Sequence, residues 1–213
     1  MKLQIAATAL AVGACAAVAP AASAHAPARV SVAGLNGSGD WVMDQVYDAD
    51  IGVHFKQHFT FAKRAGRVAS IPAGGGSVKV PIRVHVESAA DGTYSSGSGL
   101  KSYTCTATSD TNAKATVSLA RRGAKLRVTT TVLEELAPGS PDCTEPGAAW
   151  WPTDTDLFER ALRIHADVSR ASLLKPIPLQ FPETTADCGE PALVAACSEK
   201  IAWSGTLKMQ GQR

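Results

Sequence analysis

The chain has 213 residues, of which 45% are hydrophobic and 19% are charged, and its formal net charge is +2. This length suits one domain with a buried core, or at most two small ones. Lysine and arginine do not cluster along the sequence, so neither nucleic acid nor an anionic membrane surface is expected as a partner.

The first 24 residues have the pattern of a secretory signal peptide. Lys2 precedes an apolar run over residues 5–19, and Ala22-Ser23-Ala24 supplies small residues where a signal peptidase cleaves. We therefore expect a signal peptide over 1–24, a single domain over 25–213, and a secreted or extracytoplasmic location. No later segment approaches about 18 consecutive apolar residues, so we expect no transmembrane segment in the mature chain.

Cys15 permits a second interpretation of this leader. Val12-Gly13-Ala14-Cys15 resembles the lipobox of bacterial lipoproteins, in which the cysteine carries lipid and begins the mature chain. The apolar run continues beyond Cys15, and the peptidase site follows it, so we favour cleavage after Ala24. The alanine-rich composition and the style of the leader suggest a bacterial protein.

Beyond the leader, apolar and polar residues alternate with a period of two, which predicts β-strands. Strands are predicted at residues 29–33, 41–47, 53–61, 78–86, 103–107, 115–119, 126–132, 158–168 and 200–209. Turn-rich segments at residues 34–40, 73–77, 89–99, 110–112 and 138–155 separate many of them. One helical turn is expected at 172–175, before Pro176.

Two of the predicted strands carry further information. Pro81 lies within 78–86, and because proline cannot donate to a ladder, this strand is predicted at a sheet edge. The segment 158–168 also fits an amphipathic helix. We prefer a strand there because its neighbours are strands and because His165 and Asp167 then face solvent.

This pattern predicts an all-β protein with eight or nine strands and little helix. The expected architecture is an antiparallel β-sandwich of immunoglobulin-like or jelly-roll type, with Trp203 anchoring its core. A small β-barrel is the alternative, and the pattern leaves the strand order open.

Four cysteines remain after the leader, an even number that indicates two disulfides in an exported protein. Three pairings are possible. We favour Cys188 with Cys197, which are close in sequence, and Cys105 with Cys143, which would attach the long 138–155 loop to a strand. The irregular separations argue against a zinc site.

His25 would be the first residue of the mature chain, where its imidazole and the free α-amino group could chelate copper. An N-terminal histidine on an exported β-sandwich resembles the histidine-brace copper proteins, namely the lytic polysaccharide monooxygenases and the periplasmic copper carriers. The resemblance implies copper bound by His25 and a second histidine. An unligated terminus is the alternative, and in that case no cofactor is expected.

Trp150 and Trp151 lie next to each other in the long loop, where aromatic side chains could contact a partner protein or a glycan. The alternative is that one of them closes the end of the sandwich. His54 and His58 share one face of their strand. Four residues of strand span about 13 Å, too far for both to bind one metal ion directly.

No catalytic motif is evident, so we expect a non-enzymatic protein. The favoured interpretation is a secreted or cell-envelope binding or structural domain, with Trp150 and Trp151 as ligand contacts and an extracellular protein or glycan as partner. The alternative is a copper-binding protein that uses His25. A purely structural envelope role would use neither site.

Overall fold

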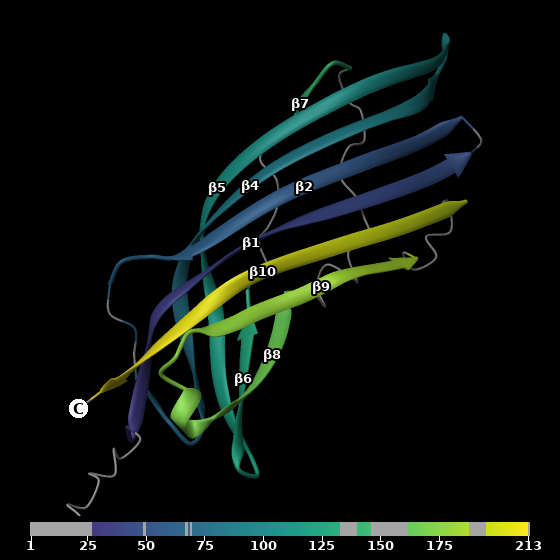
Figure 1. Ribbon diagram of the computed structural model, residues 1–213. Helices are drawn as coiled ribbons and strands as arrows, with labels where there is room; N and C mark the ends of the chain where they lie inside the picture. Colours follow the sequence, from purple (N-terminus) through teal and green to yellow (C-terminus); the bar gives the residue numbers. More distant parts are fainter. Residues whose placement is uncertain are drawn as a thin grey trace, which may run out of the picture.

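The computed structural model describes residues 27–48, 50–66, 68, 70–132, 140–145, 162–187 and 195–212, and these residues fold as one antiparallel β-sheet (Figure 1). Its strands are β1 (Arg29–Asp48), β2 (Ile51–Lys63), β3 (Ile71–Pro72), β4 (Gly76–Ser96), β5 (Gly99–Arg122), β6 (Lys125–Thr131), β7 (Asp142–Cys143), β8 (Arg163–Ser169), β9 (Ile177–Asp187) and β10 (Ala196–Gln212). One short 3-10 helix, η1 (Arg170–Ser172), joins β8 to β9.

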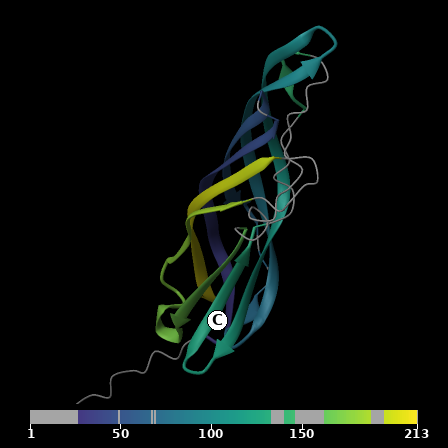
Figure 2. The same cartoon turned by 90° about the vertical axis from the view of Figure 1, so that its right-hand side faces the viewer.

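The strand order across the sheet is β8-β6-β5-β4-β2-β1-β10-β9, with β3 paired to β1 and β7 paired to β5. The sheet curls until it is nearly closed and barrel-like. Figure 1 shows β6 and β8 below β9 and β10 in this view, while the upper ends of β4 and β5 extend beyond those of the other long strands. Figure 2, turned by 90°, shows the resulting elongated shape.

The predicted all-β, antiparallel class is confirmed. Parts of one sheet face each other across a shared core, which is consistent with the expected sandwich-type architecture. The core lies on the inner face of the curled sheet and includes the fully buried rings of Trp41, Phe55 and Phe59. Trp203, the expected anchor, is 3% exposed and belongs to the same cluster.

Several predicted turns are wrong because the strands are longer than the apolar pattern suggested. Residues 34–40 and 110–112 continue β1 and β5, and residues 89–96 continue β4. The β1 stretch contains glycines, which interrupt the hydrophobic alternation without interrupting the hydrogen-bonded ladder. Two predicted strands therefore merge into β1, and two others merge into β5.

The prediction that Pro81 marks an edge strand is also wrong, because β4 lies between β2 and β5. The β2 ladder ends where Lys63 pairs with Ile82, so Pro81 lies one residue beyond it. Pro81 accepts a hydrogen bond from the Arg64 backbone N–H at 2.9 Å. The Arg64 carbonyl, which Pro81 cannot serve, accepts from Lys63 Nζ at 3.1 Å instead. The missing donor is thus compensated locally.

The described part of the 158–168 segment forms β8, with Ile164 buried and His165 and Asp167 exposed, as the strand interpretation predicted. The helical turn lies slightly earlier than expected, at η1, where the Ser169 hydroxyl accepts from the Ser172 backbone N–H. Strand β9, which forms one of the two ends of the strand order, was not predicted. It contains Pro178 and Pro182, which suit an unpaired edge.

The expected disulfide between Cys105 and Cys143 is present and joins β5 to β7. Thr144 reinforces this attachment, since its backbone N–H donates to the Thr104 carbonyl at 3.0 Å. Glu145 adds an ion pair with Lys101 at 3.3 Å. Residues 142–145 are therefore held against the free side of β5. Within the described part of the chain, no helix is long and apolar enough to cross a membrane.

Candidate functional site

Several residues singled out from the sequence lie outside the described residues: the signal segment, His25, Trp150, Trp151 and Cys188. The binding role of the tryptophans, the copper role of His25 and the Cys188–Cys197 pairing therefore stay predictions. Cys197 itself is described and is disulfide-bonded.

A different candidate lies on the outer, solvent-facing surface of the sheet, where charged side chains form rows across β1, β2 and β4. In one row, His54 stands directly opposite Asp44 on one neighbouring strand and Asp91 on the other. The imidazole Nδ1 of His54 is hydrogen-bonded to Asp44 Oδ1. The His54 side chain is 32% exposed and that of Asp44 54%, so solvent reaches the row.

A second row repeats this arrangement four residues along each strand. His58 stands opposite Asp40 on β1 and Glu87 on β4. Its Nδ1 lies 2.8 Å from Asp40 Oδ1. At about 3.3 Å per residue, the two rows are about 13 Å apart along the strands. Each row places one imidazole between two carboxylates.

Between these rows the sheet surface is hollowed. One depression of about 420 Å³ is lined by three consecutive residues from each of three strands: Asp40, Trp41, Val42, Lys56, Gln57, His58, Glu87, Ser88 and Ala89. The middle residue of each triplet is buried, at 5% exposed or less. Since alternate side chains point to opposite faces, these middle residues offer only backbone to the floor.

A second depression of about 440 Å³ continues the first toward the β1–β2 turn. Its lining includes Asp44, Val46, His54, Asp91 and Thr93, with Gly52 among them. Gly52 has no side chain to fill the surface there. We call the combined feature the outer trough, defined by its outward positions: Asp40, Val42, Asp44, Val46, Gly52, His54, Lys56, His58, Glu87, Ala89, Asp91, Thr93, Ser102 and Thr104.

A third histidine adjoins the outer trough through Glu87. His85 Nε2 lies 3.3 Å from Glu87 Oε1, and His85 Nδ1 lies 3.3 Å from Asp110 Oδ1 on β5. Arg83 Nε also contacts Asp110, at 3.3 Å. The hydrogen bond to Glu87, followed by the interactions with Asp110, raises the pKa of His85 above its ordinary value, although partial desolvation opposes the rise.

The outer trough is negatively charged at neutral pH. Its four carboxylates outnumber its one cationic side chain, Lys56, which lies between the two rows. Among the described residues, no group of three or more histidines, cysteines or carboxylates is placed to hold a metal ion. The excess of carboxylates in the outer trough suits contacts with positively charged groups.

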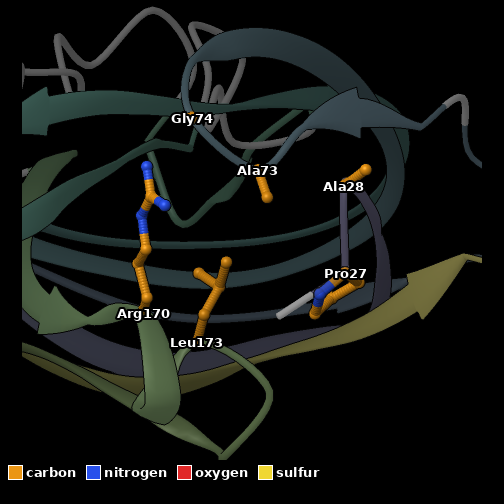
Figure 3. Close-up of a pocket in the computed structure, with 6 residues that line it drawn as sticks. All are labelled: Pro27, Ala28, Ala73, Gly74, Arg170 and Leu173. Atoms are coloured by element: carbon orange, nitrogen blue, oxygen red, sulfur yellow. The ribbon is translucent and has the colours of Figure 1, made fainter. Parts of the chain in front are cut away.

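Another pocket, of about 170 Å³, lies at the opposite end of the sheet (Figure 3). It is lined by Pro27, Ala28, Ala73, Gly74, Arg170 and Leu173, and Figure 3 shows Arg170 and Leu173 rising from one side toward Ala73 and Gly74. Pro27 is two residues from His25 in sequence, and none of the six lining residues is a histidine.

The sequence had identified His54 and His58 as outward-facing neighbours on one strand, and their exposure confirms this. Their carboxylate partners were missed because Asp40, Asp44, Glu87 and Asp91 come from other segments. Only the strand order and register place them opposite the imidazoles. Asp40 and Asp91 also lay in segments predicted as turns, so the sequence assigned them to no strand face.

Comparison with protein-family models, with curated proteins and with solved structures finds no match for this chain.

Proposed function

We propose that this chain is an exported, non-enzymatic binding protein whose contact surface is the outer trough. The observation that carries the proposal is the repeated row of carboxylate, imidazole and carboxylate, which flanks a hollow on an otherwise regular sheet face. Surface hollows with convergent polar groups are preferred contact sites, and complementary charge sets the choice of partner.

The chemistry of the trough favours an extended segment of a basic protein over a glycan. Sugar recognition commonly uses an exposed aromatic face, and none of the outward positions of the trough is aromatic. An extended peptide advances about 3.3 Å per residue, so side chains four residues apart match the separation of the two rows. Two lysines or arginines at that spacing would each contact the carboxylates of one row.

The middle of the trough adds a requirement. Val42, Lys56 and Ala89 lie opposite one another between the two rows. The residue midway between the two basic ones would therefore face a lysine. A neutral or acidic residue is favoured there, since like charges repel. The proposed partner thus has basic residues at positions i and i+4 and a neutral or acidic residue at position i+2.

Peptide binding at low ionic strength tests this proposal. The probe is an acetylated and amidated peptide with lysines four residues apart, a glutamate midway and glycines between them. Exposed ion pairs are individually weak, so we expect a dissociation constant of about 0.1–1 mM that rises with added salt. A peptide of the same composition with adjacent lysines should bind more weakly.

Variants locate the interaction. Asp44→Asn and Asp40→Asn should each weaken binding by about two- to fivefold. The matched control is Asp142→Asn, which removes an exposed carboxylate on β7, outside the trough. Equal affinity for the two peptides, or an equal effect of all three substitutions, would show that the trough is not the contact surface.

A further inference from the structure

Three histidines on the outer face are each set between carboxylates from different positions of the sheet. His54 faces Asp44 and Asp91, and His58 faces Asp40 and Glu87. His85 contacts Glu87 and Asp110. Three cationic side chains lie nearby. Lys56 stands between His54 and His58 on β2, and Arg83 forms an ion pair with Asp110. Lys200 stands on β10, opposite Val42. The remaining β10 positions opposite Asp40 and Asp44 are Ala202 and Ser198, which carry no charge.

Glu87 lies next to two of the three histidines, His58 and His85. It stands opposite His58 on β2, and its Oε1 is 3.3 Å from His85 Nε2. A proton gained by either imidazole therefore changes the charge that surrounds the same carboxylate. His54 belongs to the other row of the outer trough, and the outward position between His54 and His58 is Lys56.

The imidazoles of this surface are the groups through which its charge can respond to pH. Imidazole is the side chain that ordinarily changes charge between about pH 5 and 8, whereas exposed carboxylates stay ionised above about pH 5. An imidazole that gains a proton on acidification adds positive charge beside the carboxylates that it faces. The attraction of the trough for an external cation falls accordingly.

We propose that His54, His58 and His85 make the outer trough pH-responsive, so that mild acidification releases a cationic partner. This inference rests on the proposed binding function. By linkage, a ligand that competes with protons for the same carboxylates binds more tightly as the pH rises. The raised pKa of His85 agrees with this arrangement, because Glu87 and Asp110 stabilise its protonated form.

The test compares the wild-type protein with the triple variant His54→Gln/His58→Gln/His85→Gln. Glutamine keeps an N–H donor for each carboxylate and cannot become charged in this range. For the two-lysine peptide, we expect the wild-type affinity to fall about tenfold from pH 8 to pH 5.5, and the variant affinity to change less than about twofold.

A ligand-free measurement accompanies the titration. A histidine with a raised pKa stabilises the folded state fully below about pH 6.5, and that stabilisation is lost as the pH rises through the folded-state pKa. The wild-type melting temperature should therefore be higher at pH 6 than at pH 8, and the triple variant should lose this difference.

The outcomes separate the two proposals. Peptide binding that depends on pH in the wild type and not in the variant supports the inference. Binding of equal strength at both pH values overturns the inference and leaves the binding function standing. No binding at either pH overturns the binding function and the release step together. A variant that keeps the wild-type pH dependence shows that other groups cause it.

Discussion

At the residue scale, two facing glycines let β1 and β10 approach each other closely. Gly37 on β1 and Gly205 on β10 are directly opposite each other. A Cβ atom at Gly205 would lie 2.2 Å from the Asn36 carbonyl oxygen. Beside this position the rings of Phe61 and Trp203 meet edge to face, with centroids 5.5 Å apart. A Cβ atom at Gly37 would lie 2.4 Å from the Phe61 ring, so the missing side chain leaves room for that ring.

Replacing Gly205 with alanine should therefore destabilise the protein. The obstructing atom belongs to the backbone of β1, which cannot move without disturbing its ladder, and we expect a loss of about 1–3 kcal/mol in the free energy of unfolding. Chemical denaturation measures the change. Gly97→Ala is the matched control, because nothing lies within 4 Å of a Cβ there. Equal stability of the two variants would contradict the close approach of β1 and β10 at Gly205.

Residue identity predicted which face of each strand is buried, but not where strands continue. Phe55, Phe59 and Phe61 alternate in the sequence, and all three are buried. Gly37 and Gly39 suggested a turn because glycine is common in turns. Their role depends on Trp203 and Phe61, which come from distant segments. No local pattern could therefore distinguish a glycine that makes room for an aromatic ring from a glycine in a turn.

At the element scale, the position of a proline relative to the ladder matters more than its presence in a strand. Pro81 lies in the interior strand β4, where the partner strand β2 has just ended. Pro178 and Pro182 lie in β9, which forms one end of the strand order. The alternation of Ile177, Leu179 and Phe181 in β9 could have identified this strand from sequence.

The short strand β7 depends on its covalent link to β5. Replacing both Cys105 and Cys143 with alanine should lower the free energy of unfolding by about 2–4 kcal/mol, since the bond closes a loop in the unfolded chain. Denaturation of the variant beside the wild type measures this loss. A change below about 0.5 kcal/mol would show that the hydrogen bonds and the Glu145 ion pair alone suffice.

Register explains why the rows of the outer trough escaped prediction. A shift by one residue moves every side chain of a strand to the opposite face. The sequence placed His54 and His58 on the outward face correctly. It could not identify Asp44 or Glu87 as their neighbours, because that requires both the strand order and the pairing of three separate segments.

At the scale of the whole molecule, the curled sheet separates two regions. The beginning of β1 pairs with the end of β10, so both ends of the described chain lie together, at the end of the sheet that carries the Arg170 pocket. The outer trough lies farther along the same strands, toward the β1–β2 turn. The two ends of the described chain therefore lie away from the trough.

The central claim is that the outer trough binds a cationic segment. Backbone amide NMR during titration with the two-lysine peptide tests it most directly, because it maps contacts residue by residue. The account predicts shift changes concentrated at residues 40–46 of β1, 52–58 of β2 and 87–93 of β4. Changes concentrated instead around Trp150 and Trp151, with these three stretches unaffected, would contradict it and favour the loop as the contact surface.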